Sequence, residues 1–258
     1  MIFVVHSPTM QAVTRMTKTA LGLISRCSNW PEYYLDYLGY HKHTWVIDLK
    51  DIKLELRPGS VDKWIVAENL ILDAYEFNQL KELGVEQIFD IGANIGAFSV
   101  PAAKHLLVKE IISFEPDPDN FKLLTSNISR NNLSAIVELH NSAVSLSDAS
   151  SIRLYKGNDF GSNSTFHASG SFIDVANTHL YSLLPRIKQN ALLKMDIEGG
   201  ELEIFTPSNL EFLRKFKFIV LEFHHFLETH DKDKFEKFLT DSGFKYKSDD
   251  IIYLISGK

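Results

Sequence analysis

The sequence predicts an α/β protein with a mainly parallel sheet, and three observations carry this prediction. From residue 85 onward, short apolar runs alternate with segments of helical periodicity, which is the pattern of repeated βαβ units. A glycine-containing turn at residues 89–96 stands where the first apolar run ends and a helix is expected to begin. The 258 residues are 45% apolar and 23% charged, so the chain can bury a core of its own.

The first 83 residues follow a different pattern and are predicted to form an N-terminal extension. Residues 9–26 carry apolar side chains at helical spacing, which predicts a basic amphipathic helix. Residues 44–56 alternate apolar and polar positions, as expected of a half-buried antiparallel strand pair. Residues 64–80 are expected to form another helix.

Residues 84–258 are predicted to form the second domain, in which strands and helices alternate. Helices are expected to follow the first, second and last of its predicted strands, and two further runs at the end predict an antiparallel hairpin. The predicted strands, which share a short apolar run between polar segments, are residues 88–92, 110–115, 135–140, 151–155, 191–197 and 218–223, with the hairpin at 244–248 and 251–256.

The charge distribution excludes one class of partner. The chain has 27 basic and 33 acidic residues, a net charge of −6. Three of the basic residues, Arg15, Lys18 and Arg26, precede the first acidic residue, Glu32, so the remainder has 24 basic against 33 acidic residues. Such an acidic body argues against affinity gained by neutralising phosphates, and we expect no nucleic-acid partner.

The basic N-terminal helix leaves three interpretations open: it packs on the domain edge, lies on a membrane surface, or belongs to a cleaved leader. No apolar run approaches the roughly 20 residues that a membrane span needs. Cys27 is the single cysteine, which excludes an internal disulfide and favours a reducing compartment. A cytoplasmic location is therefore expected, with peripheral membrane contact as a further possibility.

The strongest local signal is the turn F-D-I-G-A-N-I-G, residues 89–96. Gly92 permits a sharp turn and close approach of the backbone to a ligand, and Gly96 permits close packing of a helix. Glu115 lies 23 residues after Gly92, at the end of the next predicted strand. A carboxylate at this place can accept both hydroxyls of a ribose. The alternative is an ordinary tight turn followed by a solvent-facing acid.

Two details of the turn select among nucleotide cofactors. A dinucleotide-binding turn has the pattern G-x-G-x-x-G, and here Asn94 replaces the middle glycine, so NAD is harder to place. Asp90 precedes Gly92 by two residues, and a carboxylate there suits a cationic or amino-bearing ligand. S-adenosylmethionine has a sulfonium, an α-amino group and no phosphate, which fits both details. We expect a bulky side chain at Gly92 to occupy the space of this cofactor.

Six stretches, in this order, resemble the FkbM family of S-adenosylmethionine-dependent methyltransferases. They are LRPGSVDKW (56–64), FDIGANIGAFS (89–99), FEPDPDNFKLLTSNISRNN (114–132), HNSAVS (140–145), LLKMDIEGGELEIF (192–205) and IVLEFH (219–224). The D-I-G-A-N-x-G turn is common to many methyltransferases, whereas K-x-D-I-E-G-x-E is specific to the family. The resemblance implies a Rossmann-like class I methyltransferase fold with a seven-stranded sheet. It also implies O-methylation of a hydroxyl on a sugar or natural product.

The resemblance further implies a set of cofactor-binding residues. On the methionine and ribose side these are Asp90, Gly92, Ala93, Asn94 and Gly96. Glu115 would bind the ribose, and Pro116 would turn the chain away. Asn141, Ser142 and Ala143 would lie beside the adenine. Two positions depart from the family pattern. Ser60 stands where threonine is frequent, and Tyr181 stands where many members have aspartate, which leaves the role of residues 178–184 open.

The catalytic residues are expected at the carboxyl ends of the strands, beside the cofactor crevice. Asp196 and Glu198 lie at the end of one predicted strand, and Glu222 and His224 lie at the end of the next. His224 is a candidate general base, because histidine as a residue type titrates near neutral pH, or it is a partly buried structural hydrogen-bonding group, and its neighbour His225 can take either role. Asp196 can orient the acceptor hydroxyl, hold the cofactor amine or cap a helix. A divalent ion on these four side chains is conceivable, but the spacing is not diagnostic and we assign no metal.

The polar segment 157–170 is rich in Gly, Ser and Asn and is expected to face the acceptor. Phe160 and Phe166 would then cover the site as a lid, whereas the alternative is a surface loop. The predicted function is S-adenosylmethionine-dependent O-methylation of a small-molecule acceptor, a saccharide or hydroxylated natural product. The alternative is a Rossmann-like module that binds a nucleotide cofactor without catalysis.

Overall fold

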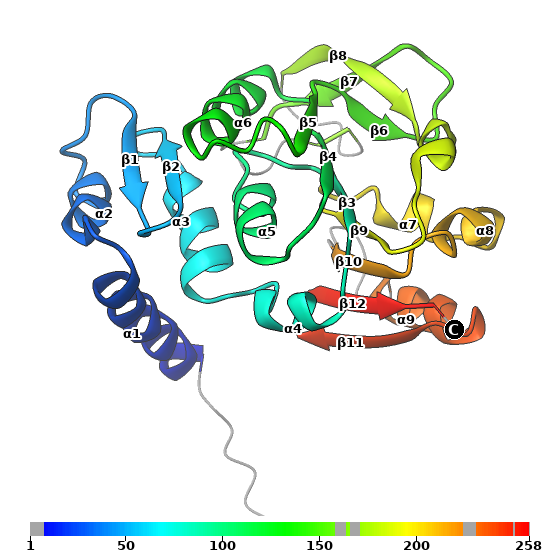
Figure 1. Cartoon of the computed structure of the whole chain (residues 1–258), viewed down its shortest axis with the longest axis horizontal. Coiled ribbons are helices and arrows are strands. Elements are labelled where there is room, and N and C mark those ends of the chain that lie inside the picture. Colours follow the sequence, from blue (N-terminus) through cyan, green and yellow to red (C-terminus); the bar gives the residue numbers. More distant parts are fainter. Residues whose placement is uncertain (1–7, 158–163, 166–170, 224–230, 250, 258) are drawn as a thin grey trace, which may run out of the picture.

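The computed structural model describes residues 8–157, 164–165, 171–223, 231–249 and 251–257, with side chains from residue 13. Its central feature is a seven-stranded sheet (Figure 1). In spatial order the strands are β11 (Lys245–Asp249), β12 (Ile252–Ser256), β10 (Phe218–Glu222), β9 (Ala191–Met195), β3 (Gln87–Ile91), β4 (Glu110–Phe114) and β5 (Val137–His140). The predicted α/β fold with a mostly parallel sheet is confirmed.

The order of the strands determines where a ligand can bind. β10, β9, β3, β4 and β5 run parallel, whereas β12 is antiparallel to both β10 and β11, which confirms the predicted C-terminal hairpin. The chain proceeds from β3 to β4 and β5 on one side, then returns to β9 on the other side of β3. The switch point therefore lies between β3 and β9, whose carboxyl ends border a crevice.

Two hydrophobic cores lie on opposite faces of this sheet. Ile88, Ile111 and Leu192 point into one core, and their neighbours Phe89 and Ile112 point into the other, as the alternation of strand residues requires. The first core is closed by α5 (Ser99–His105), α6 (Pro118–Arg130) and the N-terminal extension. The second is closed by η2 (Leu180–Arg186), α7 (Glu201–Ile204), α8 (Leu210–Leu213) and α9 (Asp231–Asp241), with η3 (Pro207–Asn209) preceding α8.

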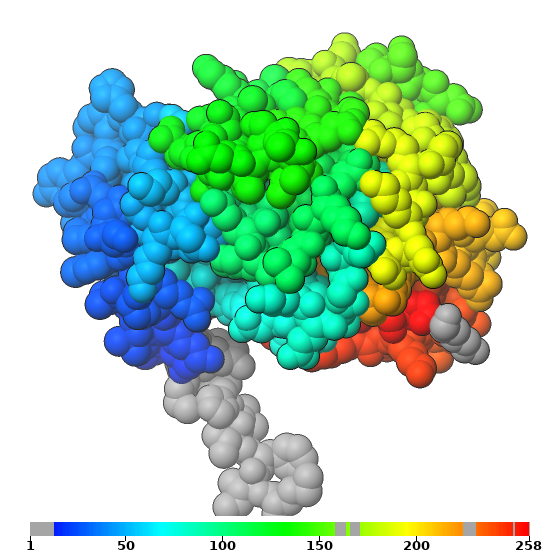
Figure 2. Space-filling model, viewed as in Figure 1, coloured from blue at the N-terminus to red at the C-terminus, as the bar shows by residue number. Residues whose placement is uncertain are grey.

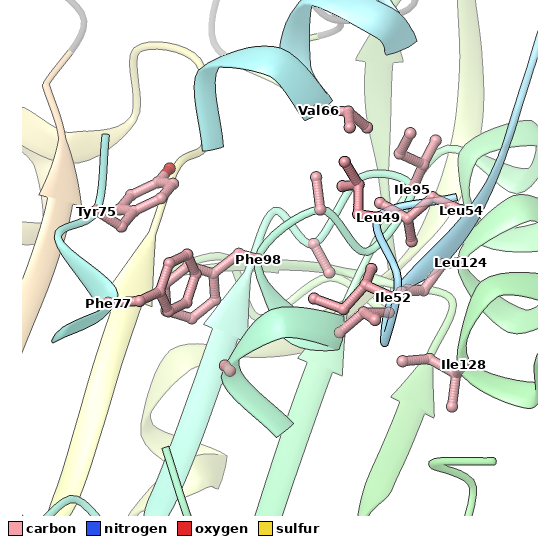
Figure 3. Close-up of a cluster of buried hydrophobic side chains, with 14 of the residues drawn as sticks. Leu49, Ile52, Leu54, Val66, Tyr75, Phe77, Ile95, Phe98, Leu124 and Ile128 are labelled. Carbon is pink, nitrogen blue, oxygen red and sulfur yellow. The ribbon is translucent and has the colours of Figure 1, made fainter. Parts of the chain in front are cut away.

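The N-terminal extension begins with the predicted helix, α1 (Pro8–Arg26), followed by α2 (Trp30–Tyr37), which the sequence analysis missed. The predicted antiparallel pair is confirmed as β1 (Trp45–Asp48) and β2 (Lys53–Leu56). Figure 3 shows side chains of this hairpin, such as Leu54, directed toward α6. The extension thus shares one core with the second domain, and a boundary at residue 83 stays a prediction.

The single helix predicted over residues 64–80 is wrong. The segment forms α3 (Asp62–Val66), a π-helical turn η1 (Ala67–Ile71) and, after a break, α4 (Phe77–Glu82). Asp73 and Glu76 adopt left-handed backbone conformations, with φ of 56° and 49°, and these interrupt the helix. Apolar periodicity did not reveal this break, because no Gly or Pro marks it.

Residues 151–155 form a strand as predicted, but outside the main sheet. β7 (Ser151–Tyr155) pairs with β8 (Phe172–His179), which also pairs with β6 (Ala143–Ser145), to give a separate three-stranded sheet. β8 was not predicted, because most of its side chains are exposed or half-buried and polar residues dominate its second half. In Figure 1 this small sheet lies beyond β5, at that edge of the main sheet.

A buried ion pair ties α2 to α3. Lys63 Nζ lies 2.8 Å from Asp36 Oδ2, and both side chains are almost fully enclosed. Asp36 also accepts a hydrogen bond from the Gly59 amide at 2.9 Å, and Lys63 donates to the Ser60 carbonyl at 3.1 Å. Removing one partner would leave the other charge buried without compensation.

We predict that Lys63→Ala lowers the free energy of unfolding by about 3–5 kcal/mol, because Asp36 then remains as an uncompensated buried carboxylate. The matched control is Lys109→Ala, whose pair with Glu86 at 2.9 Å is exposed on both sides. Lys109→Ala should lower the free energy of unfolding by less than about 1 kcal/mol. Chemical denaturation of the three proteins provides the measurement, and equal losses in both variants would contradict the prediction.

Candidate active site

The turn after β3 is shaped by a contact with the neighbouring strand end. Gly92 has a φ of 81°, and a Cβ atom there would lie 1.7 Å from the main-chain oxygen of Asp196. A side chain at Gly92 would therefore first collide with the Asp196 backbone, before any question of a ligand arises. This corrects the expectation that such a side chain would act by filling cofactor space. Gly96 is also constrained, because its Cβ would lie 3.0 Å from Leu124 of α6.

Helix α5 begins later than predicted. It starts at Ser99, so residues 92–98 form an irregular loop in place of a helix that begins directly after the glycine. Asn94, in the middle of this loop, has a left-handed backbone with φ of 49°. Asparagine tolerates this conformation better than most residues. Two side chains of the neighbouring strands, Glu115 and Lys194, form hydrogen bonds with the backbone of this loop.

Asp90 is enclosed and paired within the protein. Its Oδ2 accepts a hydrogen bond from Ser99 Oγ at 2.5 Å, and its Oδ1 lies 3.3 Å from Lys194 Nζ. Lys194, on β9, also donates to the Gly92 carbonyl at 2.7 Å and lies 3.6 Å from Asp196 Oδ2. One buried ammonium thus connects the ends of β3 and β9. The cation facing Asp90 in this structure is Lys194.

The charge of Lys194 is stabilised by its neighbours. Burial lowers the pKa of Lys194, but the carboxylates of Asp90, Asp196 and Glu222 outweigh burial and raise that pKa above its ordinary value. Lys194 therefore carries a positive charge at neutral pH. The ammonium compensates the buried Asp90 and lies beside the carboxylate of Asp196.

Glu115, at the end of β4, is almost fully buried at the crevice. Its two carboxylate oxygens accept hydrogen bonds from the amides of Asn94 and Asp117, both at 2.8 Å. Burial raises the pKa of Glu115 to about 7, although those two amide bonds lower it. The carboxylate thereby joins the turn after β3 to the end of β4, next to the first of two pockets.

The first pocket opens at the carboxyl ends of β3, β4 and β9 and encloses about 600 Å3, including solvent at its mouth. Thr165, from the segment expected to face the acceptor, belongs to its wall. Seven residues predicted to bind cofactor line it: Gly92, Asn94, Glu115, Pro116, Ser142, Ala143 and Asp196. Their role as ligands stays a prediction.

The second pocket lies on the other side of Asp196 and encloses about 640 Å3, again with open solvent. Glu222 lies in its wall and accepts a hydrogen bond from Tyr75 Oη at 3.2 Å. Burial, then the charges of Glu222, Asp196 and Asp90, raise the pKa of Tyr75 well above its ordinary value, so the phenol keeps its proton. The π-helical turn η1 contributes Glu68 and Asn69 to the same pocket.

The two pockets share one wall, which consists of Gly92, Asn94, Asp196 and Glu198. Asn94 Oδ1 is buried in this wall and has no hydrogen-bond partner among the described residues. A buried amide oxygen normally has a partner, so an unpaired one beside a pocket suits a ligand that donates a hydrogen bond. Glu198 adopts a left-handed backbone, with φ of 55°, and its carbonyl accepts from Ser164 Oγ at 2.7 Å.

Four other residues predicted to bind the cofactor do not line the first pocket. Asp90 is enclosed beneath the turn, and Gly96 faces α6. Asn141 is exposed, and its Nδ2 donates to the carbonyls of Glu115 and Pro116 at 2.8 and 3.2 Å, so it supports the loop that carries Glu115. Ala93 lines the second pocket. Three predicted residues, His224, Phe160 and Phe166, lie outside the described residues.

Two residues of the site received no role from the sequence. Lys194 stands in an otherwise apolar buried strand, A-L-L-K-M, and this single charge was a signal that could have identified it. Tyr75 lies in the irregular segment between η1 and α4, and no local pattern marks it. Among the residues that the structure describes, no group of three or more His, Cys, Asp and Glu side chains is arranged to hold a metal ion.

Comparison with known proteins identifies one matching domain. The FkbM methyltransferase domain matches residues 90–246, more than half of the chain. This range contains the turn after β3, the strand end with Glu115, and the end of β9 with Asp196. No curated protein is matched by the sequence.

Several solved structures resemble the fold at a distance. The FkbM methyltransferase of Methylobacillus flagellatus KT is 16% identical, with 76% of this chain and 53% of that chain covered at a TM-score of 0.43. TYW2 of M. jannaschii, solved with AdoMet, is 15% identical, with 84% and 85% covered at 0.40. Precorrin-6y C5,15-methyltransferase of Geobacter metallireducens GS-15 is 16% identical, with 72% and 86% covered at 0.41. The family assignment rests on the domain match alone.

We predict that Gly92→Ala destabilises the protein by more than about 3 kcal/mol, because its Cβ must displace the Asp196 backbone and the residue must keep a left-handed φ. Gly59→Ala is the matched control, since Gly59 has a similar φ of 64° and no atom of the described residues lies within 4 Å of where its Cβ would be. Gly59→Ala should lower the free energy of unfolding by only about 1–2 kcal/mol, which is the strain of an alanine in a left-handed conformation. Denaturant titration compares the two, and similar losses would refute the contact.

The raised pKa of Glu115 predicts a pH dependence of stability. An acid whose pKa is about 7 when folded and 4.5 when unfolded binds its proton more tightly in the folded state. Its contribution to stability is complete below pH 4.5 and is lost as the pH rises to about 7, by about 3 kcal/mol. The stability of Glu115→Gln should lack this dependence on pH. Unfolding free energies of both proteins across this window test it, and parallel pH profiles would count against the raised pKa.

Proposed function

Because this chain belongs to the FkbM methyltransferase family, we propose that it methylates a hydroxyl group of a small-molecule acceptor, a saccharide or a hydroxylated natural product. S-adenosylmethionine is its cofactor. The observation that carries the proposal is the pair of pockets that meet at Asp196, one beside Glu115 and one beside Glu222. A donor and an acceptor in adjoining pockets can be aligned for direct transfer.

The first pocket suits the cofactor. Glu115 offers a buried carboxylate for the two ribose hydroxyls, and Ser142 and Ala143 border the space for the adenine. The unpaired Asn94 Oδ1 offers an acceptor to an amino group. When bound, S-adenosylmethionine supplies an electrophilic methyl group attached to a positively charged sulfur. Among the described residues of this wall none is basic, which agrees with a ligand that has no phosphate.

The second pocket suits a hydroxyl-bearing acceptor. The carboxylates of Glu68, Glu198 and Glu222 can accept hydrogen bonds from hydroxyl groups, and the Asn69 amide can donate or accept. The Tyr75 hydroxyl donates a hydrogen bond to one oxygen of Glu222 and thereby fixes the orientation of that carboxylate. Lys194 is the one cation of this wall among the described residues, and it already faces Asp90. The charge balance therefore favours a neutral or amino-bearing acceptor over an anionic one.

Asp196 is the group best placed to take the proton of the acceptor hydroxyl. It lies in the wall shared by both pockets, so its carboxylate faces the place where donor and acceptor meet. Lys194 Nζ lies 3.6 Å from its carboxylate, and a carboxylate is a group that can accept a proton. Glu222, farther from the first pocket, would orient the acceptor. His224, which the sequence also predicts as a general base, lies outside the described residues, so its role stays a prediction.

We predict that Asp196→Asn lowers kcat by about 10²- to 10⁴-fold, the usual effect of losing a general base, while the affinity for S-adenosylhomocysteine changes little. Glu222→Gln should mainly raise KM for the acceptor, because it removes an orienting hydrogen bond. Steady-state kinetics and calorimetric titration separate the two effects. If Asp196→Asn instead weakens S-adenosylhomocysteine binding at nearly unchanged kcat, Asp196 holds the cofactor amine and the base lies elsewhere.

The decisive test of the proposed function has two parts. Calorimetric titration with S-adenosylhomocysteine, with NADH as the control, measures cofactor binding. Transfer of a labelled methyl group from S-adenosylmethionine to a panel of sugars and hydroxylated metabolites then measures activity. Methyl ether formation on a hydroxyl supports O-methylation. Tight binding of S-adenosylhomocysteine without transfer to any acceptor would favour the non-catalytic module, and methylation of nitrogen or carbon would overturn the assignment to oxygen.

A further inference from the structure

Helix α1 leaves most of its apolar side chains uncovered. Among its described side chains, Leu23 alone is buried, and Gly22 lies close to Ile71 of η1. By contrast, Val13, Met16, Leu21 and Ile24 are 54–73% exposed. Their spacing places them on one side of the helix, away from Gly22. The helix is therefore attached along a narrow line, and its broader apolar side is exposed. Figures 1 and 2 show α1 at the edge of the molecule.

The exposed apolar surface continues onto the neighbouring helices. A groove of about 1,230 Å3, open to solvent, lies between α1, α2 and α3. Met16, Tyr37 and Trp64 line this groove, and all three are more than one-third exposed. Tyr37 and Trp64 meet edge to face, with ring centroids 5.8 Å apart. An exposed apolar surface of this extent usually marks an interaction site.

The charge around this surface has a definite sign. Arg15, Lys18 and Arg26 all lie on α1, and no acidic residue precedes Glu32 in the sequence. Arg15 is paired with Glu68 at 2.6 Å, and both side chains of that pair are substantially exposed. The rest of the chain has 24 basic against 33 acidic residues. The charged residues of α1 are thus all basic, whereas the rest of the chain is acidic overall, and Arg26 also contacts η1 by donating to the Leu70 carbonyl at 3.1 Å.

We propose that α1 and the adjoining groove form a docking surface for an anionic lipid membrane. A helix with basic residues and an exposed apolar face is suited to lie in the plane of a bilayer interface. Tyr and Trp rings, such as Tyr37 and Trp64, favour the same interfacial region. An anionic surface attracts α1 and repels the acidic body, which fixes the orientation. No helix within the described ranges is long and apolar enough to cross a bilayer, so the contact is peripheral.

This inference concerns where the protein binds and is independent of the proposed methyl transfer. The test is co-sedimentation of the full chain with vesicles of phosphatidylcholine alone and of phosphatidylcholine with phosphatidylserine. We expect binding to the vesicles that contain phosphatidylserine, and weaker binding as salt is added. The variant Met16→Ser/Leu21→Ser/Ile24→Ser should lose at least about tenfold in affinity, because three exposed apolar side chains no longer enter the interface.

Two further variants distinguish the docking surface from general surface effects. Leu107→Ser is the matched control, since Leu107 is a leucine that is 81% exposed far from α1 in the chain, and its vesicle binding should equal that of the wild type. Lys18→Glu should weaken binding to the anionic vesicles by at least about fivefold, the effect expected for a basic residue near such a surface. Titration with S-adenosylhomocysteine confirms that each variant remains folded.

Two outcomes would overturn the proposal. The first is failure of the wild-type chain to sediment with either type of vesicle at low salt. The second is equal binding by the wild type and the triple serine variant. Sedimentation velocity adds a separate readout. If the wild type is a dimer without lipid and the triple variant is a monomer, the apolar side of α1 is covered by a second copy of the chain and the membrane proposal falls.

Discussion

The close contact between Gly92 and the Asp196 backbone is the constraint on which the site depends. It lies at the switch point of the sheet, where β3 and β9 are neighbours and their loops diverge. Lys194 reinforces it, because its ammonium binds the Gly92 carbonyl and faces both Asp90 and Asp196. Two strand ends are thereby held together by a backbone contact and a buried charge, and the side chains around them are fixed in turn.

This arrangement explains why the crevice is divided into two pockets. The residues tied together at the switch point form a wall, with the Glu115 pocket on one side and the Glu222 pocket on the other. A carboxylate in such a wall is accessible from both sides, which is the position required of a group that acts where two substrates meet. The same buried lysine that stabilises the wall also lies 3.6 Å from the Asp196 carboxylate. The charged groups that stabilise this wall are therefore the same groups that the proposed chemistry uses.

The sequence predicted the parts of the molecule that local patterns encode. Alternating strands and helices gave the fold, and the turn at Gly92 with Glu115 located the crevice, because both depend on short-range spacing. The helix over 64–80 was wrong and β8 was missed, because neither a left-handed backbone at Asp73 nor a strand with a single buried residue leaves an apolar signature. The partner of Asp90 was also missed. Lys194 follows it by more than a hundred positions, and only sheet topology brings the two together.

The N-terminal extension has a larger part in the site than its distance in sequence suggests. Its π-helical turn η1 places Glu68 and Asn69 in the wall of the Glu222 pocket, and π-helical turns recur at functional sites. Glu68 also lines the groove beside α1 and pairs with Arg15. One short segment therefore borders both the Glu222 pocket and the exposed apolar surface, and the extension to which it belongs shares one core with the sheet.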